Sequence, residues 1–206
     1  MPEGDASDRR RPRRRMLDVA LELASQGGYD ALQVRAISQL AGVSSRTIYE
    51  HFQSLDALLI VAVAEQSEGL YRQLTDAPKG RTPAARVNQV IGELTETMTA
   101  NRELTVALLR ALLSGKPDVA QYVDGFRQVL QAILVNAIAP VGATKRDREV
   151  AEILESIWFT ALVGWAIGAD TDAHIGELMR RFRWFPSVGV KLLIGTLFGL
   201  VLVFMS

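Results

Sequence analysis

The chain has 206 residues, 49% of them hydrophobic, with 23 basic side chains, 23 acidic side chains and no cysteine. This length allows one large domain or two small ones, and the composition excludes a disordered chain and a multispanning membrane protein. The lack of cysteine excludes disulfides, thiol catalysis and cysteine-based metal sites, and two histidines are too few for a histidine-rich site. The polar, arginine-rich N-terminus does not read as a secretory signal, so we expect a cytoplasmic protein.

A basic segment lies near the N-terminus, although the net charge is zero. Six of the seven residues from Arg9 to Arg15 are arginine, and the stretch from Arg9 to Tyr49 holds eight arginines against three acidic residues. Basic arms commonly bind polyanions, because each neutralised phosphate releases condensed counterions. The alternative is a solvated tail without a partner. We expect residues 1–11 to form a disordered basic arm.

Apolar residues recur at three- and four-residue spacing along nearly the whole chain, which is the pattern of amphipathic helices. Helices are predicted at residues 16–24, 34–41, 44–52, 54–74, 87–98, 104–112, 119–134, 150–165 and from 171 onward. The clearest loop is residues 75–83, which are rich in proline, glycine and charge. Because no stretch alternates apolar and polar residues over the length of a strand, the sequence predicts an all-α protein of about nine helices.

Residues 34–52 predict a helix-turn-helix, in which two short helices are joined by a tight turn. Gly42 suits the turn because it adopts positive φ without steric cost, and Ser44 can cap the second helix. The side chains expected to point inward are those of Ile37, Leu40, Val43, Ile48 and Phe52. The side chains left on the outward face, near the end that enters the major groove, are those of Ser45, Arg46, Thr47 and Tyr49.

The stretch from Gly42 to Phe52 reads GVSSRTIYEHF and resembles the recognition-helix motif G-V-S-x-x-T-[LI]-Y-x-H-F of the TetR family of bacterial regulators. The resemblance covers about residues 12–60. It implies a three-helix DNA-binding domain over residues 12–56 and a helical ligand-binding and dimerisation domain over residues 57–206. One departure is Leu55, where the family usually has a phosphate-contacting lysine. With Glu50 and Asp56 nearby, we expect weaker electrostatic attraction to DNA on that side.

The candidate DNA-contacting residues are Arg13, Arg14, Gln33, Arg35, Ser44, Ser45, Arg46, Thr47, Tyr49 and His51. An exposed arginine such as Arg46 can bind guanine through two hydrogen bonds, and hydroxyl groups can bind phosphates or base edges. For His51 the resemblance favours a phosphate contact over a metal site, since no other ligand lies at useful spacing. Helix-turn-helix proteins usually bind two half-sites as dimers, so the expected partner is palindromic double-stranded DNA.

The resemblance further implies a repressor that is released from DNA by a small hydrophobic effector. Three segments resemble the KstR-like actinobacterial branch of the family: GGYDALQVRAI, NRELTVALLRAL and ESIWFTALVGWAIG. That branch implies a bulky lipid-like acid or its coenzyme A thioester as effector. The candidate cavity residues are Met98, Asn101, Arg110, Tyr122, Phe126, Trp158 and Phe159. Apolar residues at helical spacing are also ordinary core, so both interpretations stay open for them.

The family pattern places the homodimer interface on two helices, at about residues 148–168 and 171–200. The candidate interface residues are Val150, Leu154, Ile157, Ala161 and Trp165. The tail, residues 188–206, is almost entirely apolar and follows a cluster of arginines. Its length and flanking charge also fit a membrane span, which would make the chain a membrane-tethered interaction protein. We favour a tail packed in the dimer.

An enzyme is the weakest interpretation of the sequence. It shows no Ser–His or Cys–His arrangement, no P-loop, no dinucleotide-binding glycine motif and no credible set of metal ligands. We therefore expect no catalytic residues, no metal and no cofactor.

Overall fold

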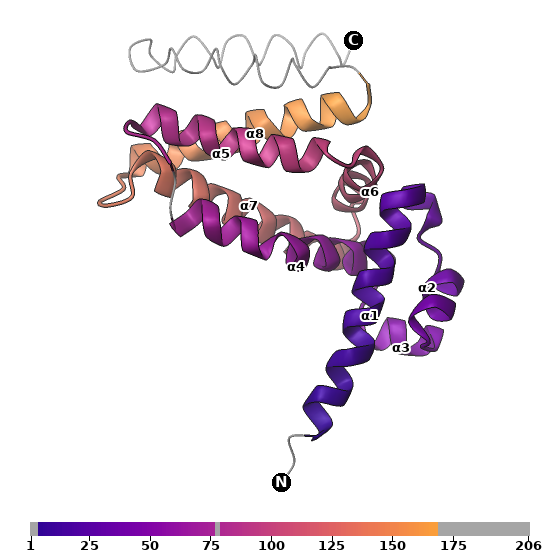
Figure 1. Cartoon of the computed structure of the whole chain (residues 1–206). Helices are drawn as coiled ribbons and strands as arrows, with labels where there is room; N and C mark the ends of the chain where they lie inside the picture. Colours follow the sequence, from indigo (N-terminus) through magenta and orange to yellow (C-terminus); the bar gives the residue numbers. More distant parts are fainter. Residues whose placement is uncertain (1–3, 77–78, 169–206) are drawn as a thin grey trace.

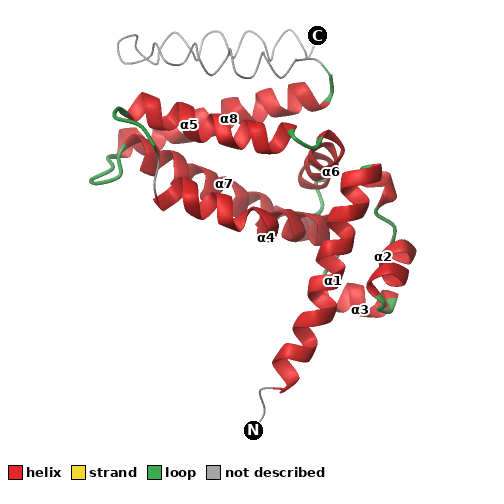
Figure 2. Ribbon diagram, viewed as in Figure 1, coloured by secondary structure: helices red, strands yellow, loops and turns green. Residues whose placement is uncertain are grey.

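The structure is a computed structural model that describes residues 4–76 and 79–168. Over these residues all the regular secondary structure is helical (Figure 2), which confirms the expected all-α class. The elements, labelled in Figure 1, are α1 (Gly4–Gly27), η1 (Tyr29–Ala31, a short 3-10 helix), α2 (Val34–Ala41), α3 (Ser45–His51), α4 (Leu55–Asp76), α5 (Pro83–Thr99), α6 (Arg102–Leu112), α7 (Pro117–Ile138) and α8 (Lys145–Ala166). The ninth helix, expected from residue 171, and the apolar tail lie outside the described residues.

Helix α1 begins at Gly4, so residues 4–11 are helical and not the disordered arm that we expected. The helix continues through Pro12. Arginine has a high intrinsic helix propensity, which favours extension of α1 through the basic run. Figure 1 shows the N-terminal part of α1 extending beyond α2 and α3. The basic segment is therefore carried on a projecting helix.

The head, defined as α1 to α3, has a small core of its own. Met16 and Leu17 from α1 meet Ile37 from α2 and Ile48 from α3, and all four are almost fully buried. Leu40, which we expected to point inward, is instead 63% exposed. The buried face of α2 runs through Ile37 and Ala41, four residues apart, and Leu40 lies to one side of that line.

The body, defined as α4 to α8, is a helical bundle in which α4 and α6 both pack against α1 (Figure 1). Side-chain caps mark the starts of four of its helices: Ser54 for α4, Thr82 for α5, Asn101 for α6 and Thr144 for α8. Four of the five residues expected at a dimer interface belong to the core of the single chain, namely Leu154, Ile157, Ala161 and Trp165, and Val150 is half-buried against it. These side chains therefore pack within one chain.

No helix of the described part of the chain is both long enough and apolar enough to cross a membrane. The tail on which the membrane interpretation depended, residues 188–206, lies outside that part.

Candidate DNA-binding surface and ligand cavities

The turn between α2 and α3 fixes the orientation of α3. Gly42 ends α2 in the left-handed conformation, with φ 64° and ψ 41°, and its N–H donates to the Ser38 carbonyl. A side chain at this position would be strained, because L residues rarely adopt positive φ. Ser44 then caps α3, since its Oγ accepts from the Thr47 N–H at 3.0 Å and lies 2.9 Å from Thr47 Oγ1. Both hydroxyl groups therefore belong to the cap.

The outward face of α3 carries polar side chains above a buried apolar anchor. Arg46 has 88% of its side chain exposed and Tyr49 is 53% exposed, whereas Ile48 between them is fully buried. The Arg46 Nε lies 2.8 Å from Glu50 Oε1, one turn along the helix. Exposed pairs of this kind contribute little stability, so Arg46 can exchange Glu50 for another partner. Four further candidates are also exposed: Gln33 and Arg35 at the start of α2, and Ser45 and His51 in α3.

The two candidate arginines of α1 lie in different surroundings. The guanidinium of Arg13 is 2.6 Å from Glu65 Oε1 on α4 and 5.7 Å from the centre of the Phe52 ring. Arg14 is more exposed, and its Nε contacts Asp18 Oδ1 at 3.0 Å within α1. Arg13 therefore connects the head to α4, whereas Arg14 faces solvent.

A polar cluster joins the head to the body around Asp56, whose side chain is fully buried at the start of α4. The Tyr29 hydroxyl donates to Asp56 Oδ1, and Lys116 Nζ lies 2.7 Å from Asp56 Oδ2. Burial raises the pKa of the Tyr29 hydroxyl, and its hydrogen bond to Asp56 raises it further. The hydrogen bond to Asp56 likewise raises the pKa of Lys116. Asp56 is thus buried and paired with Lys116 and Tyr29, whereas we had expected it to add negative charge on the DNA side.

Two residues predicted to anchor a ligand instead connect α6 to the head. Asn101 caps α6 by accepting from the Leu104 N–H at 2.9 Å, and its Nδ2 donates to the Ser25 carbonyl at 3.4 Å. Arg110 lies 4.2 Å from the centre of the Tyr29 ring and 2.8 Å from Asp30 Oδ1. Neither lines either of the two cavities described next.

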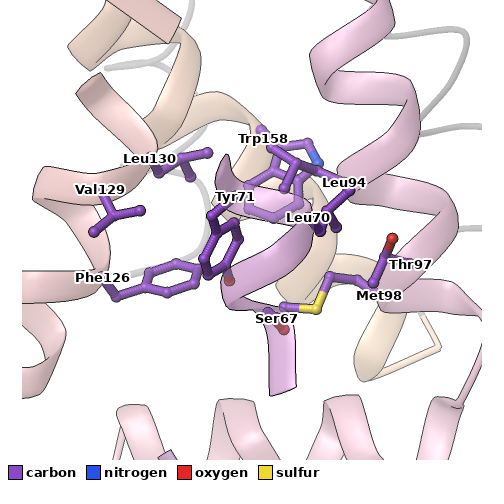
Figure 3. Close-up of a pocket in the computed structure, with 10 residues that line it drawn as sticks. All are labelled: Ser67, Leu70, Tyr71, Leu94, Thr97, Met98, Phe126, Val129, Leu130 and Trp158. Carbon is purple, nitrogen blue, oxygen red and sulfur yellow. The ribbon is translucent and has the colours of Figure 1, made fainter. Parts of the chain in front are cut away.

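The first cavity lies between α4, α5, α7 and α8 and encloses about 20 Å³, about enough for one water molecule. Three predicted residues contribute to its lining, Met98, Phe126 and Trp158, and the ten lining side chains are drawn in Figure 3. The Trp158 indole N–H donates to Thr95 Oγ1 at 2.9 Å, so this polar group is satisfied within the core. The cavity is nearly filled by its own side chains.

The second cavity lies between α6, α7 and α8 and encloses about 290 Å³. Its lining residues are Leu112, Leu113, Val123, Phe126, Arg127, Glu155, Ser156, Phe159 and Thr160. Phe126 and Phe159 were predicted, and Phe126 borders both cavities. Tyr122 is half-buried against the core and lines neither. The charged pair Arg127 and Glu155 was not predicted, although an acidic residue between the buried Leu154 and Ile157 was an available signal.

Comparison with known proteins shows what this arrangement resembles. Residues 16–62 match the model of bacterial regulatory proteins of the tetR family, and residues 80–182 match the tetracyclin repressor-like C-terminal domain. The HTH-type transcriptional repressor KstR of Rhodococcus jostii (strain RHA1) is 32% identical over 153 residues, which cover 74% of this chain and 72% of that protein.

Two crystal structures share the fold at low sequence identity. A TetR transcriptional regulator from Rhodococcus sp. RHA1 has a TM-score of 0.76 at 19% identity, over 89% of this chain and 99% of that one. Thermus thermophilus FadR, a TetR-family transcriptional repressor in complex with lauroyl-CoA, has a TM-score of 0.69 at 18% identity. The match covers 86% of this chain and 95% of that one. With both family models and a repressor at 32% identity in agreement, the chain belongs to the tetR family of bacterial regulatory proteins.

Proposed function

We propose that this protein is a ligand-responsive transcriptional repressor that binds palindromic DNA as a homodimer and is released by a hydrophobic effector. The observation that carries the proposal is the outward face of α3, where Arg46 and Tyr49 are exposed above the buried Ile48. Such a helix enters the major groove with its N-terminal residues toward the bases. Family membership and similarity to the repressor KstR support the regulatory role.

The exposed residues divide into base-reading and phosphate-binding groups. Arg46 and Ser45 lie at the start of α3, where arginine can bind guanine bidentately and serine can bind a base edge. Ser44 and Thr47 hold the helix end by capping it. The side chains assigned to phosphates and the DNA backbone are those of Arg13, Arg14, Gln33, Arg35, Tyr49 and His51. Contacts of this kind position the protein without reading sequence.

The effector is a hydrophobic, lipid-like molecule. FadR in complex with lauroyl-CoA shares the fold, and the chain resembles the repressor KstR. The second cavity offers a largely apolar lining of about 290 Å³, at the lower end of the volumes of ligand pockets, about 300–1,000 Å³.

Release from DNA follows from a shift between two arrangements of the body. An effector that binds one arrangement more tightly raises its population. Helix α4 begins at the head and runs through the body, so its displacement changes the separation of the two recognition helices in the dimer. The helices then no longer fit successive major grooves.

The test is an Arg46→Ala variant with Arg72→Ala as a matched control. Arg72 forms an exposed pair with Glu68 one turn away on α4, just as Arg46 does with Glu50 on α3. A tight-binding duplex is first selected from a random library with the wild-type protein, and affinities are measured for it and for a scrambled duplex. Loss of a base contact of about 1–3 kcal/mol predicts about 5- to 150-fold weaker binding of Arg46→Ala to the selected duplex only.

The Arg72→Ala control is expected to bind both duplexes like the wild type. Equal losses on the two duplexes with Arg46→Ala would exclude base reading by this residue. Failure of the wild type to bind any duplex at low salt would overturn the proposed function as a whole.

A further inference from the structure

The second cavity holds one buried negative charge beside a loosely bound positive charge. The Glu155 side chain is 4% exposed, whereas that of Arg127 is 44% exposed. The Arg127 Nε and Nη2 atoms both lie 3.4 Å from Glu155 Oε2, and Gln131 Nε2 donates to the same oxygen at 3.4 Å. Good charge-assisted hydrogen bonds are about 2.7–2.9 Å long. The buried carboxylate is therefore held by long bonds, with the positive group on its solvent side.

The other polar groups of the lining cannot replace these bonds. The Ser156 hydroxyl donates to the Glu152 carbonyl at 2.9 Å, and the Thr160 hydroxyl donates to the Ser156 carbonyl at 2.8 Å. Among the lining residues that the structure describes, the rest are apolar. A ligand group that donates a hydrogen bond would therefore meet an acceptor, Glu155, whose existing partners are weak. A ligand carboxylate would meet a like charge in an apolar surrounding, which disfavours its ionised form.

We propose that Glu155 is the specificity-determining residue of this cavity, and that its ligand is an apolar molecule bearing a hydrogen-bond donor, an alcohol or an amine. The donor binds the Glu155 carboxylate, and the apolar part packs against Phe126, Phe159 and the end of α6. A neutral alcohol leaves the Arg127–Glu155 pair in place. An ammonium group takes over the role of Arg127, which turns toward solvent. The inference rests on the proposed ligand-responsive function and adds the chemistry that the effector presents to α8.

The probes are four molecules with the same chain length: octan-1-ol, octylamine, octanoate and octane. Their affinities for the full-length protein are measured by ligand-detected NMR titration in the absence of DNA. Because hydrogen bonds to charged groups contribute about 1.5–3 kcal/mol, the alcohol or the amine is expected to bind at least about tenfold more tightly than octane. Octanoate is expected to bind no more tightly than octane.

Glu155→Gln is the decisive variant, and Glu149→Gln is its control. Glu149 lies on the same helix but outside the cavity, in an exposed pair with Lys145. Glu155→Gln leaves Arg127 without its carboxylate partner, so we expect the order of affinities to reverse. The affinity for octanoate is expected to rise about tenfold, and the affinity for octylamine to fall about tenfold. Glu149→Gln is expected to keep the wild-type order.

A second variant, Arg127→Gln, guards against loss of folding in the first. It leaves Glu155 without its cation and is expected to strengthen octylamine binding and weaken octanoate binding. The inference is overturned if octanoate binds the wild type as tightly as octan-1-ol, or if neither variant changes the order of affinities. Since these measurements use no DNA, they fail independently of the proposed repressor function.

Discussion

Asp56 illustrates at the scale of one residue how burial changes the role of a charge. Its place in the first turn of α4, two residues after Ser54, is favourable to the helix dipole. Its neighbours in sequence do not reveal that Tyr29 donates to one of its oxygens and Lys116 pairs with the other. The carboxylate is thus part of the connection between head and body. Loss of either partner leaves a buried charge less compensated.

This cluster predicts a loss of stability at alkaline pH. The pKa values of Tyr29 and Lys116 lie above their ordinary values of 10.0 and 10.5 in the folded protein. Above about pH 10 the unfolded chain therefore releases protons that the folded protein keeps, so the free energy of unfolding falls as pH rises. Denaturant titrations between about pH 8 and pH 11 are expected to show a steeper decline for the wild type than for Tyr29→Phe. Parallel declines would contradict the assignment.

At the scale of elements, α6 is the helix that touches both the head and the second cavity. Its first turn contacts the Ser25 carbonyl through Asn101, and its last turn contacts Tyr29 and Asp30 through Arg110. Leu112 and Leu113, two and three residues after Arg110, line the cavity. If the proposed effector displaces this end of α6, we expect it to act on the head through Arg110.

Removing the cation of this connection is expected to destabilise the protein. Lys116→Met leaves buried Asp56 with Tyr29 alone, and breaking a fully buried ion pair costs about 3–5 kcal/mol. Because the Lys116 side chain is 49% exposed, water compensates part of the loss, and we expect about 1–2 kcal/mol. Urea denaturation measures the difference.

Lys145→Met is the matched control for that prediction, because Lys145 is 90% exposed and pairs with Glu149 on its own helix. It is expected to change the free energy of unfolding by less than about 0.5 kcal/mol. The double variant Asp56→Asn with Lys116→Met is expected to recover part of the loss. If the two single lysine variants were equally stable, the Lys116–Asp56 pair would have no structural role.

At the scale of the whole molecule, the proposed homodimer requires a surface other than the side chains first assigned to it. The core of the single chain already buries four of them, namely Leu154, Ile157, Ala161 and Trp165. Among the large apolar side chains of α8, that of Ile153 is the most exposed, at 37%. Apolar residues of this kind become fully buried when two copies associate.

Sedimentation is expected to give twice the chain mass of 22.6 kDa. Ile153→Glu is expected to shift the equilibrium toward the single chain, because a charge buried at the interface is not compensated. Val141→Glu is the control, since Val141 is 91% exposed in the loop before α8. A single-chain mass for the wild type at every concentration would exclude the homodimer.

Local sequence signals were sufficient for the helices and for the recognition turn. Apolar spacing located α2 to α8, and Gly42 and Ser44 end one helix and begin the next as predicted, because a left-handed turn and a side-chain cap involve only neighbouring residues. The extent of α1 was missed, since the basic run has no apolar periodicity to mark it as helical.

Packing between distant segments settled the roles of the polar residues. In the folded structure Asn101 and Arg110 connect α6 to the head, and Glu155 is a buried charged residue that lines the second cavity. Each of these side chains sits on a helix that the pattern predicted, but its partner comes from another helix. Spacing along one helix shows which residues share a face, and it does not show which other helix will cover that face. For this reason the DNA-binding motif could be predicted from a short stretch of chain. The second cavity and the contacts between head and body could be identified only in the folded structure.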